Sequence, residues 1–154
     1  MTTTHDTPQS VLLEELAKLE TQLATPAISG EEAAWLTATS EALRVVEREV
    51  RVAVGKTHPA QFGQMRKEDA ALGSQIESLE QEDQANLQRL DEIVTRIAKL
   101  HGKYTTEANE SLLKEDFDNF VDEGLAFVVA VRKQETALTT WFAEAFRRDV
   151  GAAD

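Results

Sequence analysis

The strongest pattern in the sequence is a stripe of apolar residues between Ser111 and Arg148. Apolar positions recur there at alternating steps of four and three residues, which places them on one face of a helix. The stripe contains, in order, Leu113, Phe117, Phe120, Gly124, Phe127, Val131, Gln134, Leu138, Trp141 and Ala145. It is widened by Val121, Val128, Phe142 and Phe146. We therefore expect one long helix that faces a globular core.

Two earlier stretches of the chain carry the same helical spacing. Leucines at positions 12, 16, 19 and 23 predict a first helix, which Pro8 or Ser10 would open and which would end near Ala24, ahead of Pro26. A second helix is expected from Glu31 to about Val54. Ser29 and Glu32 have the spacing of a capping box, in which Glu32 would reach back to the backbone of Ser29.

The clearest break in the pattern is Gly55 to Pro59, because glycine suits a helix end and proline suits a helix start. A short helical segment, about residues 60–65, is expected to follow it. The third long helix would span residues 67–100 and end at Gly102, and Thr105 or Thr106 would cap the fourth.

No stretch alternates apolar and polar residues as a half-buried strand does. The predicted fold is all-α: an antiparallel up-down four-helix bundle with a short extra helical segment between its second and third helices. We expect residues 10–149 to form one helical-bundle domain after a flexible tail of residues 1–9. Two helical hairpins that dimerise are the alternative. The predicted core includes Leu16, Leu43, Val50, Leu79, Leu90, Phe117, Phe120, Val128 and Leu138.

Composition narrows the classes of partner. The chain has 28 acidic and 16 basic residues, a formal net charge of -12, which disfavours nucleic acid and anionic membrane surfaces. No membrane span is expected, because the longest apolar run, residues 125–131, is far shorter than the ~20 residues needed. Cysteine is absent and the first residues lack the pattern of a signal peptide, so we expect a cytoplasmic protein.

The residues that usually carry chemistry are few. The histidines are His5, His58 and His101, and none belongs to a Glu-x-x-His or His-Glu-x-x-His motif. His5 and His101 are expected to be ordinary surface histidines. No phosphate-binding loop and no Ser-His-Asp spacing is present. We therefore expect no enzyme, no catalytic residue, no cofactor and no bound metal.

Three polar residues fall on the apolar stripes. Asp83 and Asn86 lie on the seam of the third helix, and Gln134 lies on the seam of the fourth. They either form a polar site in the bundle interior or fix the helix register. We expect Asp83 to be hydrogen-bonded to Gln134, to a helix neighbour or to solvent, because a buried carboxylate without partners is strongly disfavoured.

Several segments resemble the hemerythrin-like family, whose bundle holds an oxygen-binding di-iron site. The first helix reads LLEELAKLETQL, which is similar to the family's "LxxEHxxL", with Leu16 in place of the His. The second ends VGKTHPAQF, similar to "HxxxEHPxLF", with Val54 at the His position and Thr57 or His58 at the Glu position. The third carries LEQEDQANL, with Asp83 at the His position.

The fourth helix reads VRKQETALTTWF, similar to "HxxxEExLF", with Gln134 in place of the His and Leu138 in place of the Glu. The resemblance implies the bundle fold. Because most ligand positions are replaced, it also implies a degenerate interior site, made of Asp83, Gln134, His58 and Asn86, without a di-iron centre.

Three functions remain open. The first is a non-catalytic, hemerythrin-like bundle that acts as a structural, regulatory or protein-interaction module, with a protein partner or a second copy bound. The second is a metal- or small-ligand-binding bundle with an altered interior site, and the third is an enzyme of unrecognised chemistry. The candidate partner surface is Trp141, Phe142 and Phe146, aromatic residues that either the first helix or another subunit should cover. The basic residues Arg132, Lys133, Arg147 and Arg148 lie near it.

Overall fold

The computed structural model describes the backbone of residues 7–106 and 110–152, and the side chains of residues 7–105 and 113–147. Within these ranges the chain forms helices and no strand. The elements are α1 (Pro8–Ala24), α2 (Glu32–Val52), the π-helical turn η1 (Ala53–Thr57), α3 (His58–Glu68), the 3₁₀ turn η2 (Ala70–Leu72), α4 (Gly73–Thr106) and α5 (Glu110–Ala152).

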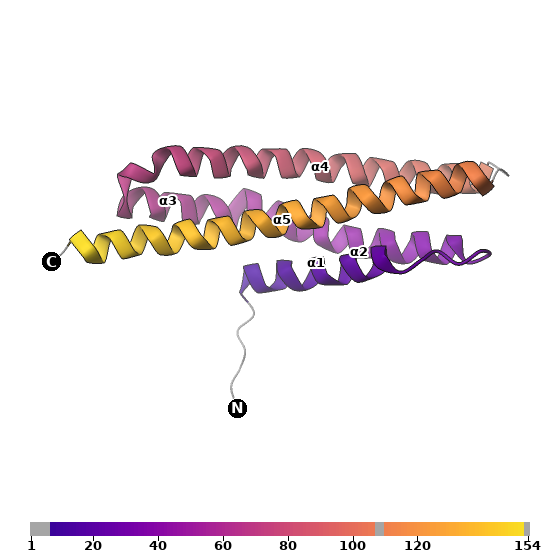
Figure 1. Cartoon of the computed structure of the whole chain (residues 1–154), viewed down its shortest axis with the longest axis horizontal. Helices are drawn as coiled ribbons and strands as arrows, with labels where there is room; N and C mark the ends of the chain where they lie inside the picture. Colours follow the sequence, from indigo (N-terminus) through magenta and orange to yellow (C-terminus); the bar gives the residue numbers. More distant parts are fainter. Residues whose placement is uncertain (1–6, 107–109, 153–154) are drawn as a thin grey trace, which may run out of the picture.

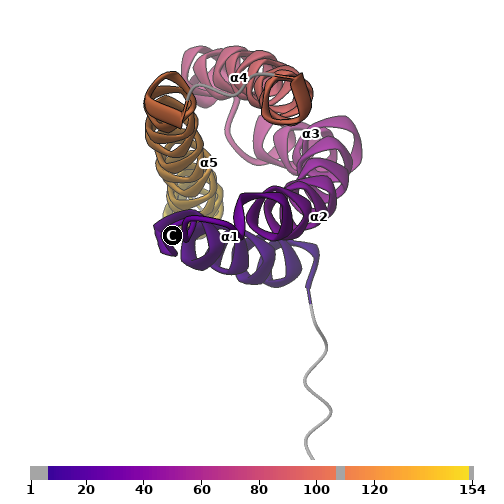
Figure 2. The same ribbon diagram turned by 90° about the vertical axis from the view of Figure 1, so that its right-hand side faces the viewer.

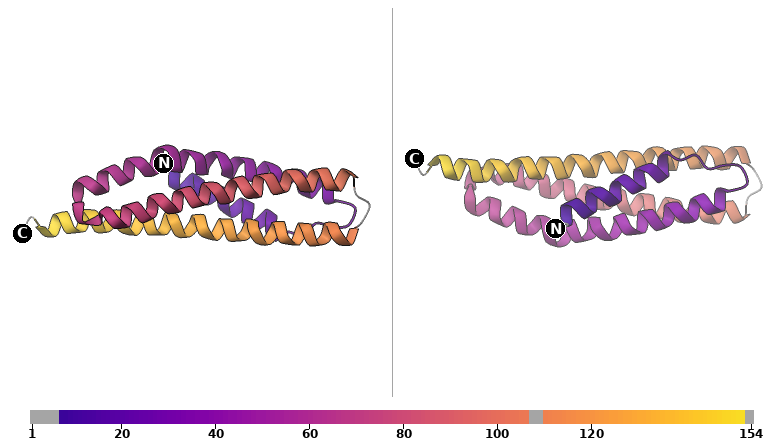
Figure 3. Two further views of the ribbon diagram at one scale, coloured as in Figure 1. Left: turned by 90° about the horizontal axis from the view of Figure 1, so that it is seen from above. Right: turned by 90° about the horizontal axis from the view of Figure 1, so that it is seen from below.

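Four long segments lie side by side: α1, the run from α2 to α3, α4 and α5 (Figure 1). The end view shows them arranged around a common axis in the order α1, α2, α4, α5 (Figure 2). The chain turns back after each segment, and α1 extends along only part of the bundle (Figure 3). The predicted all-helical bundle is therefore confirmed.

α1 matches the predicted first helix closely. Pro8 occupies its first turn, where a missing N–H costs nothing, and the side chain of Thr7 accepts a hydrogen bond from the Ser10 backbone. The cap is thus Thr7 rather than Ser10. Pro8 and Gln9, which were expected to belong to a flexible tail, lie in the first turn of α1. Residues 1–6 of that tail lie outside the described residues.

The start of α2 differs from the predicted capping box. Glu31 occupies the cap position without a side-chain hydrogen bond, and the Glu32 carboxylate accepts from the backbone N–H of Gly30 instead of Ser29. The reason is the left-handed backbone of Gly30, whose φ is 90°. This conformation brings the Gly30 N–H, and not that of Ser29, within reach of Glu32.

The predicted break at Gly55 to Pro59 is wrong. Helical backbone continues from α2 into α3 through the π-helical turn, in which the His58 N–H donates to the carbonyl of Ala53. The extra short segment exists as α3, but it is a continuation of the second helix. A π turn accommodates one additional residue per turn, so proline and glycine here widen the helix instead of ending it.

The reversal that was expected at Gly55 occurs at Asp69. Its backbone is extended, with φ -149° and ψ 96°, and its carboxylate accepts from the Ala71 N–H. Lys67 therefore lies in the last turn of α3, which ends at Glu68, instead of starting the third segment. The end of the third helix was also misplaced: Gly102, Thr105 and Thr106 all lie within α4, and α5 begins at Glu110.

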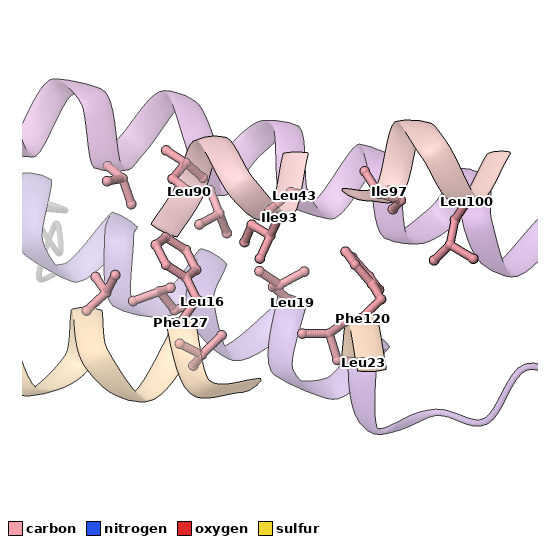
Figure 4. Close-up of a cluster of buried hydrophobic side chains, with 14 of the residues drawn as sticks. Leu16, Leu19, Leu23, Leu43, Leu90, Ile93, Ile97, Leu100, Phe120 and Phe127 are labelled. Atoms are coloured by element: carbon pink, nitrogen blue, oxygen red, sulfur yellow. The ribbon is translucent and has the colours of Figure 1, made fainter. Parts of the chain in front are cut away.

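Two apolar clusters form the core. The larger one joins the four leucines of α1 to residues of α2, α4 and α5, and part of it is shown in Figure 4. The smaller one joins α3, η2, α4 and α5 without α1. Every residue of the predicted core is buried. Burial of each such side chain contributes roughly 1.5–3 kcal/mol. The bundle thus has four helices over the length that α1 covers, and three beyond the end of α1.

Candidate functional site: a buried ion triad at His58

Three titratable side chains meet where the two core clusters join. His58 is the first residue of α3, Asp83 lies on α4 and Glu135 lies on α5. Their exposed fractions are 3%, 3% and 4%. The π turn is the cause of this placement, because the buried positions step from Ala53 to His58 by five residues instead of four. A regular α-helical turn would have directed Thr57 inward.

The imidazole of His58 lies between the two carboxylates. Its Nδ1 is 3.0 Å from Asp83 Oδ1 and 2.9 Å from Oδ2, and its Nε2 is 2.6 Å from Glu135 Oε1. Gln134 Nε2 donates to Asp83 Oδ1 at 2.9 Å and to the Leu79 carbonyl at 2.7 Å. Of the three alternative partners expected for Asp83, the structure has Gln134, and His58 is a further partner that was not expected.

A residue of α1 donates a hydrogen bond to the remaining oxygen of Glu135. Gln9 Nε2 donates to Glu135 Oε2 at 3.1 Å and to Thr139 Oγ1 at 2.8 Å. Glu135 thus accepts from the bundle interior through His58 and from the first turn of α1 through Gln9. Among the described residues, no buried side-chain nitrogen or oxygen lacks a hydrogen-bond partner.

The triad sets the charge of the imidazole. Burial alone would lower the pKa of His58, but the hydrogen bonds that its ring donates to Asp83 and Glu135, together with the negative charges of these two groups, outweigh burial and raise this pKa to about 9. His58 is therefore an imidazolium near neutral pH, with both ring N–H groups donating. The side-chain amides of Gln134 and Gln9 also donate to Asp83 and Glu135 respectively.

The predicted interior site is only partly the observed one. His58, Asp83 and Gln134 come together as expected. Asn86 is also buried and lines a small gap next to these residues, but it makes no hydrogen bond to them. Its Oδ1 accepts from Arg89 Nη1 at 2.6 Å. Glu135 was missed, although it lies seven residues after Val128 on the widened stripe of α5.

Gln9 was also missed, because nothing in a polar residue at a helix start indicates a contact with a residue 126 positions away. His101, predicted as a surface histidine at a helix end, is half-buried within α4. Its Nε2 lies 3.2 Å from Ser40 Oγ. His5 lies outside the described residues.

The space beside the triad is small. Two gaps of about 10 Å³ each adjoin His58 and Glu135, one under the first turn of α1 and one toward Asn86. Such a volume is about that of one water molecule. The two ring nitrogens point to opposite sides, so Asp83 and Glu135 do not converge on a common point. No group of three or more His, Asp or Glu within the described ranges has a geometry that could hold a metal ion.

The positions that the resemblance assigns to iron ligands are filled by apolar packing. Leu16 and Leu138 are fully buried in the two core clusters, and Val54 is partly buried against the larger one. A larger surface hollow of about 530 Å³ lies over α4, beside Asp91, Arg96 and Lys103. Ion pairs to Arg51, Glu123 and Asp116 respectively engage these three side chains.

The candidate partner surface lies toward the C-terminal end of α5. Trp141 and Phe142 pack against the smaller core cluster, which α3 and α4 complete. Of the two covers that were expected, the first helix or another subunit, α1 contributes no residue to that cluster. Phe146 remains 38% exposed, with its ring 4.8 Å from that of Phe142. Of the four basic residues nearby, Arg132 pairs with Glu20, and the side chain of Arg148 lies outside the described part.

Comparisons of the chain with protein-family models, curated proteins and solved structures find no match. The hemerythrin-like resemblance therefore stays a prediction. No helix within the described residues is both long and apolar enough to cross a membrane.

Proposed function

We propose that this chain is a non-catalytic helical bundle, of the antiparallel up-down, hemerythrin-like kind, that acts as a structural or protein-interaction module. One observation carries the proposal: the interior polar site is filled by its own side chains. Both nitrogens of His58 and the carboxylates of Asp83 and Glu135 are bonded within the protein. The adjoining gaps of about 10 Å³ have no room for a substrate. Cysteine is absent, which suits a reducing cytoplasm.

The second candidate is a metal-binding bundle with an altered site. The observation that favours it is the donor set itself, since imidazole and carboxylate are common ligands of iron and zinc. To bind an ion, His58 would have to release one carboxylate and turn, which opens a buried ion pair. We expect this cost, several kcal/mol, to make binding weak.

Anaerobic titration with ferrous iron, followed by air and elemental analysis, tests the two candidates. We expect no stoichiometric uptake and no visible absorption bands. His58→Gln provides the control, because iron held at surface carboxylates would bind equally to both proteins. Uptake of one or two irons per chain that is lost in His58→Gln would replace the first candidate by the second.

The exposed edge of the aromatic cluster, Phe142 and Phe146, is the surface that we propose for protein contact. A second copy is the partner that can be tested directly. In sedimentation velocity runs over a concentration series, we expect the wild type to associate weakly and Phe146→Ser to stay monomeric. Val129→Ser is the matched control, because Val129 is also on α5 and is 47% exposed. Identical monomeric behaviour of all three proteins would remove this surface from the proposal.

A further inference from the structure

We propose that the groove between α2 and α5 that holds α1 is an exchangeable helix-binding site, and that α1 of a second copy can occupy it. Two chains would then trade their first helices in a domain-swapped dimer. This site is separate from the aromatic edge of Phe142 and Phe146, and the variants below carry Phe146→Ser, so that association through that edge does not enter the test.

α1 is a peripheral element with one covalent connection to the described bundle. Its principal contacts are with α2, α5 and the π turn. The smaller core cluster contains no residue of α1, so its packing does not depend on that helix. The end of the bundle formed by α3, η2 and the start of α4 is therefore packed without α1.

The connection between α1 and α2, residues 25–31, is a hinge on the surface. Ile28 is 63% exposed, and Gly30 is held in a left-handed conformation. The hinge is tied at its two ends, where Trp35 Nε1 donates to the Thr25 carbonyl at 2.7 Å and Glu32 accepts from Gly30. A peripheral helix on such a hinge is the arrangement from which domain swapping starts, since exchange costs only the hinge contacts.

Every contact that seats α1 could be made equally by a second copy. Its four leucines pack into the larger core cluster, and Leu23 lies against Gly124. Glu20 pairs with Arg132, and Gln9 donates to Glu135 and Thr139. In the exchanged dimer, Gln9 of one copy would complete the ion triad of the other.

These contacts also define the chemistry of the occupant. It must be a helix with leucines at steps of four, three and four, an amide three residues before the first leucine, and a carboxylate eight residues after it. The pattern in α1 meets all of these requirements. A second copy of this chain is therefore the partner that the groove fits.

The first experiment prevents α1 from packing in the groove of its own chain, an arrangement called cis below. Residues 25–31 are replaced by seven strong helix formers, so that α1 and α2 become one continuous helix that cannot fold back on itself. We expect a dimer by light scattering, with full helical content and slow hydrogen exchange in α1. A replacement by seven glycine and serine residues is the control, and it should keep α1 in cis as a monomer. A monomeric continuous-helix variant with rapidly exchanging α1 amides would overturn the proposal.

The second experiment uses the Glu20–Arg132 pair in chains with the natural hinge. Glu20→Arg and Arg132→Glu each place like charges together in cis, whereas exchange of α1 between the two variants restores both ion pairs. After joint refolding of equal amounts, native mass spectrometry should find the mixed dimer well above the twofold excess over either homodimer that random pairing gives. The control is the double variant, which carries both Glu20→Arg and Arg132→Glu in one chain. Because its ion pair is restored within the chain, it should show no preference for a mixed dimer with the wild type. A mixture that contains only monomers would count against exchange.

Discussion

At the residue level, His58 is stabilised by both carboxylates of the triad and each carboxylate by His58, so the removal of Glu135 leaves His58 paired with Asp83 but takes the acceptor from its buried Nε2. Glu135→Ala should therefore lower the free energy of unfolding by about 1–3 kcal/mol, the cost of a buried donor left without an acceptor. Glu123→Ala is the matched control, since Glu123 lies on the same helix as Glu135 and pairs with Arg96 of α4, but is 42% exposed. Its cost should stay within ~1 kcal/mol. Urea unfolding followed by circular dichroism measures both values. Equal costs would mean that the triad is not buried in solution.

The same triad predicts a pH dependence. The pKa of His58 is raised from 6.5 to about 9 by Asp83 and Glu135. Its contribution is thus fully present below pH 6.5 and is lost as the pH rises through 9. The loss should be on the order of 3 kcal/mol. It is measured as the difference between wild type and His58→Gln in urea midpoints from pH 6 to pH 10. Parallel curves for the two proteins would contradict the assignment.

Two helical glycines give a contrast in packing. A methyl group at Gly63 on α3 would meet nothing within 4 Å, so Gly63→Ala should stabilise the protein by about 0.5–1 kcal/mol. A methyl group at Gly124 would lie 2.8 Å from Leu23 Cδ1. Gly124→Ala should therefore cost about 1–3 kcal/mol in overpacking, against about 1 kcal/mol gained in helix propensity.

A double-mutant cycle separates these two effects at Gly124. In a Leu23→Ala background the clash is absent, so Gly124→Ala should become stabilising there. Thermal unfolding of the four proteins gives the coupling energy. Additive changes would show that α1 does not approach α5 as closely as the structure has it.

At the level of elements, periodicity sufficed wherever apolar residues kept their spacing. The stripes of α1, α2 and α5 identified the helices and the buried faces, because burial of a stripe determines which way a helix turns. The ends were less predictable. Gly102 and Thr105 are tolerated inside α4, since propensity costs of about 1 kcal/mol are outweighed by packing along a long helix.

The π turn accounts for the main error in the second segment. Gly55 and Pro59 signal a helix end by local preference, yet the step from Ala53 to His58 was readable as a helical stripe with one residue too many. Had that step been followed, His58 would have been placed in the core next to Asp83. The partner on α5, Glu135, and the contact of Gln9 depend on the relative positions of three helices. No local pattern contains that information.

At the level of the whole molecule, the net charge of -12 exerts repulsion that the surface ion pairs do not cancel. Pairs such as Arg51–Asp91 and Arg89–Glu82 are about half exposed, so each contributes little. A rise in sodium chloride from about 10 mM to about 150 mM shortens the Debye length from about 30 Å to about 8 Å. The salt weakens the pairs, but it weakens the more numerous repulsions between carboxylates more.

Salt should therefore raise the unfolding temperature, by about 2–4 °C if the gain is on the order of 1 kcal/mol. Differential scanning calorimetry at neutral pH gives this shift. The effect should shrink near the sequence pI of about 4.7, where the net charge vanishes and little repulsion is left to screen. A fall in the unfolding temperature with salt at neutral pH would mean that attractive pairs, and not repulsion, dominate the surface of this bundle.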